Sequence, residues 1–138
     1  MTDEQIINIL NFIPLENGNY IPSKNKYESY DAENFTSIVE IKKRSSYYDL
    51  SLIEKLKYTQ NINTAYNTGR AFYYVVFSDP RLTIWDITWL DRVNYKYGWE
   101  NSLQVATTEF ENNIKINKNV GYLNVTRSIF NADISNLI

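Results

Sequence analysis

The chain of 138 residues contains no cysteine and no histidine. Without cysteine, disulfide bonds, thiolate zinc sites and thiol nucleophiles are excluded. Without histidine, no imidazole can serve as a general base, a metal ligand or a member of a catalytic triad. Zinc hydrolases, histidine-metal nucleases and Ser-His-Asp hydrolases are therefore excluded. The remaining residue types favour a carboxylate-bound Mg²⁺ or Mn²⁺ as the most accessible catalytic device.

Long hydrophobic runs are also absent, because no apolar stretch approaches the roughly 18 residues that a membrane span requires. Residues 1–5 are acidic and lack the basic and apolar regions of a signal peptide. A hydrophobic fraction of 43% and a charged fraction of 22% are typical of folded soluble proteins. We therefore expect a single domain over residues 1–138, with no membrane partner and a cytoplasmic location.

The net charge of -2 hides an uneven distribution. Between residues 42 and 70, six lysines and arginines stand against two acidic residues, whereas residues 71–111 are acidic overall. A basic segment of this kind can line a phosphate backbone, although a solvated protein face gives the same pattern. The abundance of Asn, Ile, Lys and Tyr matches an AT-rich genome, as in phages and low-GC bacteria.

One apolar segment, Thr36–Lys43, is predicted to be a strand that carries charged residues. Alternation along a strand places Ile38, Glu40 and Lys42 on one face, with Val39 and Ile41 on the other. The Glu40 carboxylate and the Lys42 ammonium are then about 7 Å apart along the strand. A second carboxylate beside them completes a group that can hold a hard divalent cation next to a lysine that orients water. This arrangement is typical of a metal-dependent phosphodiesterase.

The second carboxylate is Asp31, at the end of a predicted strand over Tyr27–Asp31. The two strands are expected to pair as a hairpin. If the numbers of paired residues add to an odd value such as 69 or 71, Asp31 lies on the face of Glu40 and Lys42, and an even value places it on the opposite face. The metal hypothesis therefore requires an odd register. The alternatives are a turn role for Asp31 and an ordinary surface ion pair between Glu40 and Lys42.

The remaining elements indicate an α/β fold with a mixed central sheet flanked by α-helices. A capping box at Thr2 and Gln5 predicts a helix over residues 3–11, and a second box at Ser51 and Glu54 predicts a helix from Leu52 to Asn67 that ends at Gly69. That second helix can connect two parallel strands. Further predictions are strands over Ala71–Phe77, Leu82–Thr88 and Val120–Val125, a turn at Asp79–Pro80, a helix over Ser128–Ile138, and core positions for Trp85, Trp89 and Trp99.

This succession resembles the PD-(D/E)XK, or restriction-endonuclease-like, nuclease superfamily. Its motif is an acid at the end of one strand, then Glu/Asp-x-Lys on the next strand, then a helix and further strands. The motif maps onto Asp31, Glu40 and Lys42. Small phage-encoded members are similar over about Tyr27 to Leu123, at segments 53–58, 73–77, 85–86 and 107–110. The sequence departs from the pattern at Tyr30, where the family has Pro, and at Thr64, which stands where a Gln-x-x-x-Tyr signature would end in Tyr.

The resemblance implies a restriction-endonuclease-like core and a Mg²⁺-dependent DNA endonuclease, with Mn²⁺ as an alternative metal. Asp31, Glu40 and the Ile41 carbonyl would bind the metal, and Lys42 would position the attacking water. The superfamily often forms homodimers that cut both strands, as Holliday junction resolvases do on branched DNA, whereas a monomer would more naturally nick. Branched or replicating DNA is one candidate substrate, and the oligomeric state stays open at this point. Residues expected to bind DNA are Lys43, Arg44, Lys55, Lys57 and Lys118. Of these Lys118, like Thr107, Thr108 and Lys115, is carried only by the resemblance.

Several alternatives stay open at the level of sequence. Glu4, Glu16 or Glu28 could supply a further acid to the metal site. The tyrosines at positions 47, 48 and 58 could stack on unpaired bases or pack as amphipathic core residues. A non-catalytic nucleic-acid-binding or assembly protein with the same fold is the main rival to the enzyme, and a plain interaction protein is a third hypothesis.

Overall fold

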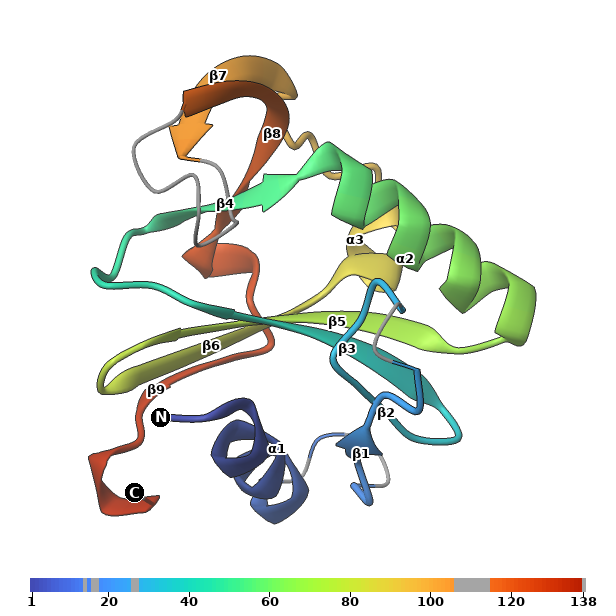
Figure 1. The fold of residues 1–138 in the computed structure, drawn as a ribbon, viewed down its shortest axis with the longest axis vertical. Coiled ribbons are helices and arrows are strands. Elements are labelled where there is room, and N and C mark those ends of the chain that lie inside the picture. The colour runs from blue at the N-terminus through green and yellow to red at the C-terminus, as the bar shows by residue number, and fades with distance from the viewer. Residues whose placement is uncertain (14, 16–17, 26–27, 106–114, 138) are drawn as a thin grey trace.

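A computed structural model describes residues 1–13, 15, 18–25, 28–105 and 115–137. Its main sheet has six strands in the order β1-β2-β3-β5-β6-β9. Helix α1 lies on one face of this sheet and helices α2 and α3 on the other (Figure 1). The predicted α/β fold with a mixed sheet between helices is therefore confirmed. The bounds are α1 Asp3–Phe12, β1 Ile21–Pro22, β2 Ala32–Glu33, β3 Ser37–Lys43, α2 Lys55–Thr68, β5 Ala71–Ser78, β6 Arg81–Asp86, α3 Ile87–Arg92 and β9 Phe130–Asp133.

Strands β3 and β5 form the centre of the main sheet and run parallel, with Glu40 opposite Tyr74. The chain passes from one to the other through α2, which is the predicted crossover connection. Strand β6 then returns antiparallel to β5. The order of an acid, a Glu-x-Lys strand, a helix and a parallel strand is the order predicted for a restriction-endonuclease-like core.

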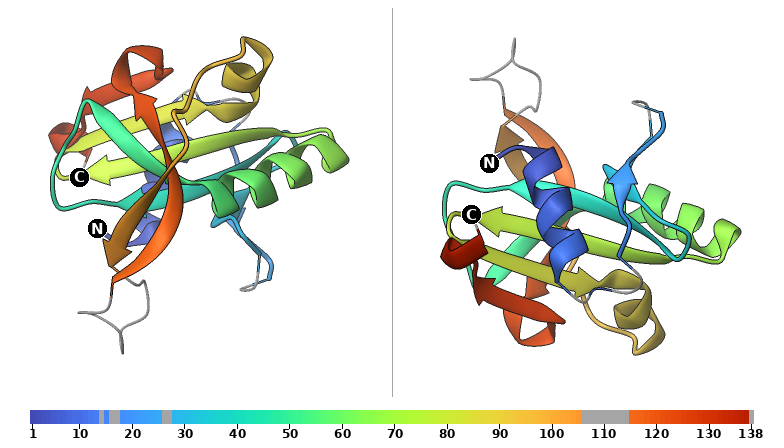
Figure 2. Two further views of the ribbon diagram at one scale, coloured as in Figure 1. Left: turned by 90° about the horizontal axis from the view of Figure 1, so that it is seen from above. Right: turned by 90° about the horizontal axis from the view of Figure 1, so that it is seen from below.

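A second sheet was not predicted. It consists of β4 (Leu50–Glu54), β8 (Lys115–Asn124) and β7 (Glu100–Val105), in the order β4-β8-β7 with antiparallel pairing. In Figures 1 and 2 it lies on the same side of the main sheet as α2. Because β4 leads directly into α2, the pairing of β4 with β8 fixes the position of the helix N-terminus.

Two hydrophobic clusters lie on the two faces of the main sheet. Val39 and Ile41 pack in the cluster that includes α1. Ile38 packs in the other cluster, with Tyr74 and Trp85. The predicted alternation of side chains along β3 is therefore confirmed, and Glu40 and Lys42 belong to the face that carries α2 and the second sheet.

Helix α1 begins as predicted. The Thr2 hydroxyl accepts a hydrogen bond from the Gln5 backbone N–H at 3.2 Å, and the Thr2 N–H donates to the Gln5 side chain at 2.8 Å. Helix α2 ends at Gly69, whose φ of +65° is the left-handed conformation that glycine adopts easily. The predicted turn at Asp79–Pro80 joins β5 to β6. No helix of the described residues could span a membrane, since the longest has 14 residues and about 20 are needed.

Three elements before the C-terminal segment differ from the predictions. The helix predicted from Leu52 begins at Lys55, because residues 50–54 pair with β8 and Glu54 is the N-cap. The predicted strand over residues 27–31 is wrong for residues 28–31, since the strand that pairs with β3 is β2, and residue 27 lies outside the described residues. Strand β6 ends at Asp86, whose side chain accepts a hydrogen bond from the Trp89 N–H at 3.1 Å and caps α3.

The C-terminal segment also differs. The helix predicted over residues 128–138 is wrong, because Phe130–Asp133 pairs with β6 as strand β9, between short 3₁₀ turns at Val125–Arg127 and Ser135–Leu137. The last predicted strand is longer than expected, at Lys115–Asn124. Of the three tryptophans predicted in the core, Trp85 is fully buried, Trp99 is half-buried, and Trp89 on α3 is 43% exposed.

Candidate active site

Glu40 and Lys42 lie side by side on β3, on the face toward α2. The Glu40 side chain is buried, with the residue only 3% exposed, and its Oε1 lies 3.3 Å from Lys42 Nζ. Strand β2 pairs with β3 only at Ile38 and Val39, so the edge of β3 beyond Val39 is not covered by β2. The two charged side chains thus lie on the part of β3 that has no paired strand on the β2 side.

Asp31 occupies this open edge. Ala32 pairs with Val39, and the sum of 71 is the odd register that the metal hypothesis requires. The Asp31 N–H donates to the Val39 carbonyl at 2.8 Å, and the Asp31 carboxylate accepts from the Ile41 N–H at 2.7 Å. Because the N–H and C=O of one strand residue point to the same side, the Ile41 carbonyl also faces the Asp31 edge. The structure therefore brings together the predicted metal ligands.

The environment of the two carboxylates disfavours their ionised forms. Burial, followed by the charge of Asp31, raises the pKa of Glu40 to about 7, and Lys42 and Lys57 oppose this shift. Burial also raises the pKa of Asp31, against the hydrogen bond from the Ile41 N–H. The second Glu40 oxygen, Oε2, is buried and has no hydrogen-bond partner among the described residues. A buried acceptor of this kind is costly unless a donor or a cation fills it.

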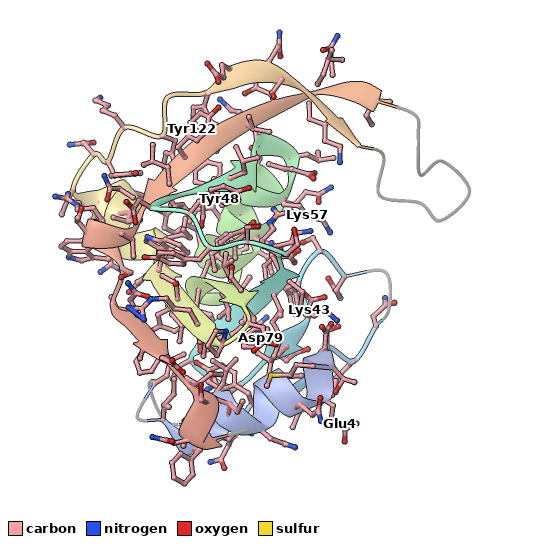
Figure 3. The ribbon with its side chains drawn as sticks, turned by 90° about the vertical axis from the view of Figure 1, so that its left-hand side faces the viewer. Glu4, Lys43, Tyr48, Lys57, Asp79 and Tyr122 are labelled. Atoms are coloured by element: carbon pink, nitrogen blue, oxygen red, sulfur yellow. The ribbon has the colours of Figure 1, made fainter. Side chains whose placement is uncertain are left out.

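Lys57 on α2 is the second cation of the site. Its charge favours the ionised form of both Asp31 and Glu40, and its side chain is half-buried. Figure 3 shows Lys57 and Lys43 on either side of β3, with Lys57 toward α2. The sequence predicted Lys57 as a phosphate contact but gave no signal that it lies near the carboxylates.

One turn further along α2, Asn61 forms hydrogen bonds with the segment that precedes Asp31. Asn61 is fully buried, and its amide donates to the Ser29 carbonyl at 3.2 Å and accepts from the Ser29 hydroxyl. Because Ser29 is two residues before Asp31, these bonds hold the Asp31 segment against the helix that carries Lys57.

The other predicted DNA-binding residues lie outside this group. Lys43 projects to the opposite face of β3, and its ammonium lies 3.0 Å from the Asp3 carboxylate. Arg44 follows β3 and is exposed, with its N–H bonded to the Phe77 carbonyl.

Two further lysines flank the second sheet. Lys55 Nζ lies 5.0 Å from the ring centroid of Trp99, and Lys118 Nζ lies 3.0 Å from the Glu54 carboxylate. Residues 107–110 lie outside the described part of the chain, as does the side chain of Lys115. The lysines at 43 and 118 are therefore engaged within the chain, whereas Lys42 and Lys57 face the carboxylates.

An acidic residue that the sequence analysis did not place near the site affects the electrostatics of Asp31. The charge of Asp3, at the start of α1, raises the pKa of Asp31. Glu4 and Glu28 are exposed, and Glu16 lies outside the described residues. Among the described residues no group of three or more acidic side chains is placed to hold a metal ion. The chain thus offers two carboxylates and a carbonyl, which suits Mg²⁺, since this ion usually keeps several waters and is bound through one or two carboxylates.

No protein-family model and no curated protein matches the chain. Among solved structures, the chain is similar to Hjc, a Holliday junction resolvase from the hyperthermophilic archaeon Archaeoglobus fulgidus. The two sequences are 15% identical, the match covers 86% of each chain, and the TM-score is 0.46.

Proposed function

We propose that the chain is a metal-dependent endonuclease that hydrolyses phosphodiester bonds in DNA at Asp31, Glu40 and Lys42. The observation that carries the proposal is the buried Glu40 carboxylate, which lies between Lys42 and Asp31 and has an oxygen without a partner among the described residues. In a purely structural ion pair, a buried oxygen without a hydrogen bond would lower the free energy of unfolding and bring no compensating contact. Perturbed carboxylates at an open strand edge are typical of functional sites.

The residues present fit a hard divalent cation. The carboxylates of Asp31 and Glu40 and the Ile41 carbonyl would hold Mg²⁺, or Mn²⁺, and all three offer oxygen donors. When bound, the ion supplies Lewis-acid stabilisation of the phosphate and lowers the pKa of a water molecule. Its positive charge would also relieve the repulsion between the two carboxylates.

The lysines of the site have separate roles in this proposal. Lys42, 3.3 Å from Glu40, orients the attacking water and offsets negative charge on the phosphate. Lys57, which approaches from α2, helps to keep both carboxylates ionised and contacts a neighbouring phosphate. Because Glu40 loses its proton near pH 7, metal binding and cleavage should increase as the pH rises through this value.

We propose branched or replicating DNA as the substrate and a second copy of the chain as a partner. A two-fold symmetric pair of sites can cut both strands of a symmetric branch. Arg44, directly after β3, and Lys55, the first residue of α2, are exposed and would contact further phosphates of the substrate. The amino-acid usage supports a phage-encoded enzyme that acts in the host cytoplasm.

The alternative is a non-catalytic nucleic-acid-binding or assembly protein with the same fold. One observation favours it: the described residues supply no third acidic ligand around Asp31 and Glu40. Such a protein would bind DNA equally well with and without divalent metal and would cut neither duplex nor branched DNA.

The test compares wild type with Asp31→Asn and Glu40→Gln on supercoiled plasmid and on a labelled four-way junction, in Mg²⁺, Mn²⁺ or EDTA. We expect cutting only with metal, and a loss of roughly 10²-fold or more in each variant. Asp49→Asn, at an exposed carboxylate away from the site, should cut like the wild type. Mg²⁺ should also raise the melting temperature of the wild type and not of Glu40→Gln. Cutting that persists in EDTA or in Glu40→Gln would contradict the proposal.

A further inference from the structure

A second polar site lies on the other side of α2, where three tyrosine hydroxyls converge on one carboxylate. The Tyr58 hydroxyl lies 2.7 and 2.8 Å from the two oxygens of Asp91. The Tyr97 hydroxyl donates to the Oδ1 of Asp91 at 3.2 Å, and the Tyr66 hydroxyl reaches the Oδ2 at 3.5 Å. These side chains come from α2, from α3 and from the segment that precedes β7, and they line a hollow of about 600 Å³.

The walls of the hollow are aromatic, and the exposure of their side chains differs. Tyr97 is buried and stacks on Trp99, with ring centroids 4.9 Å apart and planes at 23°. Tyr58 packs against both rings. Tyr66, by contrast, is 55% exposed, so a face of its ring is open to a ligand. The hollow thus has a packed aromatic wall and one exposed ring.

Asp91 retains capacity to accept a hydrogen bond from a ligand. Burial, together with the charge of Asp91, raises the pKa values of Tyr58, Tyr66 and Tyr97, so all three hydroxyls remain protonated donors. Three hydroxyl protons face a carboxylate that has about four acceptor positions, and the bond from Tyr66 is long. A ligand with N–H donors can therefore bind Asp91 beside the Tyr66 ring.

The charge around the hollow decides between two kinds of ligand. A carboxylate among aromatic rings could hold a cation. However, the surrounding surface carries Lys96, which lines the hollow, Lys55, which covers Trp99, and Arg92, which follows Asp91. Three cations around a single carboxylate disfavour a cationic ligand and favour one that carries phosphate as well as neutral N–H donors, such as the amino group of a base.

We infer that this hollow binds an unpaired nucleobase, which stacks on Tyr66 and donates hydrogen bonds to Asp91, with its phosphates on Lys55 and Lys96. Lys57 and Tyr58 are consecutive on α2, so the helix directs one toward Asp31 and Glu40 and the other toward Asp91. Unpaired nucleotides next to a cut site would thus bind beside the N-terminal turns of α2. The inference rests on the proposed function in taking DNA as the ligand, and it specifies that this DNA has unpaired bases.

The test measures binding of a short fluorescein-labelled oligodeoxycytidine and of an abasic strand of the same length, by anisotropy in EDTA. Cytosine offers an amino donor, and we expect it to bind about tenfold more tightly than the abasic strand. Tyr66→Leu and Asp91→Asn should each abolish this difference and leave the weaker phosphate-dependent binding. Phe12→Leu is the matched control, because Phe12 is an exposed aromatic residue on α1, across the sheet.

The two proposals can fail separately. Equal affinity of the wild type for the two strands, or an undiminished base preference in Tyr66→Leu, would show that the hollow does not bind bases, even if paired plasmid is cut. If Asp91→Asn fails to fold, Tyr66→Leu still tests the inference, since Tyr66 is exposed and its replacement leaves the core intact. A base preference that depends on Tyr66, in a chain that cuts no DNA, would support this inference and contradict the proposed endonuclease.

Discussion

At the scale of single residues, Glu40 is held in an unfavourable environment for its charge. Its side chain is buried, Asp31 lies across the strand edge, and only one of its oxygens is paired, with Lys42. A carboxylate in such a place costs free energy that a purely structural residue would avoid. The arrangement is reasonable for a residue that awaits a cation, because the cation removes both the repulsion and the missing contact.

This environment predicts an unusual dependence of stability on pH. The pKa of Glu40 is about 7 in the folded state, above its ordinary value of 4.5, so between these values the folded state retains a proton that the unfolded chain releases. The contribution of Glu40 to the free energy of unfolding is therefore largest below pH 4.5 and falls as the pH rises to about 7. In metal-free buffer, Glu40→Gln should be more stable than the wild type by about 1 to 3 kcal/mol at about pH 8.

Urea unfolding of both proteins at about pH 5 and about pH 8 measures this effect. The two proteins should differ little at the lower pH, where Glu40 is protonated in the folded state. Asp49→Asn removes an exposed carboxylate and should show no such gain. A Glu40→Gln variant that is less stable than wild type at the higher pH would mean that the pair with Lys42 outweighs the cost of burial.

The sequence located part of this site and missed part of it. Asp31, Glu40 and Lys42 follow from strand alternation and one register, both of which are local properties. The positions of Lys57 and Asp3 depend on how two helices pack on opposite faces of the sheet, and a single sequence carries no such information.

At the scale of secondary structure, the start of α2 shows how long-range pairing overrides a local signal. Ser51 and Glu54 have the spacing of a capping box, yet residues 50–54 form a strand because Leu123 and its neighbours pair with them. Glu54 becomes the N-cap without a side-chain cap bond, and its carboxylate pairs with Lys118 instead. Thr2 and Gln5 have the same spacing with no competing strand, and there the capping box forms.

The two sites form a matched test of this interpretation. Thr2→Ala removes a hydrogen bond to the first turn of α1 and should lower the free energy of unfolding by about 1 kcal/mol. Ser51→Ala lies in β4 and removes no cap, so its effect should be at most about half as large. Urea unfolding of both variants at one pH decides the comparison. A larger loss in Ser51→Ala than in Thr2→Ala would contradict the strand assignment.

At the scale of the whole molecule, α2 separates two sites on one side of the main sheet. The candidate active site joins Glu40 and Lys42 of β3 with Lys57 of α2, whereas the second site joins Tyr58 of α2 with Asp91 of α3. Figure 1 shows how α2 lies relative to β3 and α3. The mixed sheet and its parallel crossover could be predicted, because residues 36–86 carry clear periodic signals. The second sheet and β9 could not, since their pairing joins segments that are distant in the sequence and individually weak.

The measurement that tests the central claim most directly is metal-dependent cleavage of a four-way junction by Lys42→Met and Lys43→Met. The two lysines are adjacent, but Lys42 lies beside Glu40 and Lys43 lies on the opposite face, paired with Asp3. We expect Lys42→Met to lose roughly 10²-fold or more in the rate of cutting with little loss of DNA binding. Lys43→Met should retain most of the activity, because Lys43 does not face the carboxylates of the site. The variant should also stay folded, since an exposed ion pair contributes about 1 kcal/mol or less to stability. Equal losses in the two variants, or full activity in Lys42→Met, would contradict the assignment of this strand face as the active site.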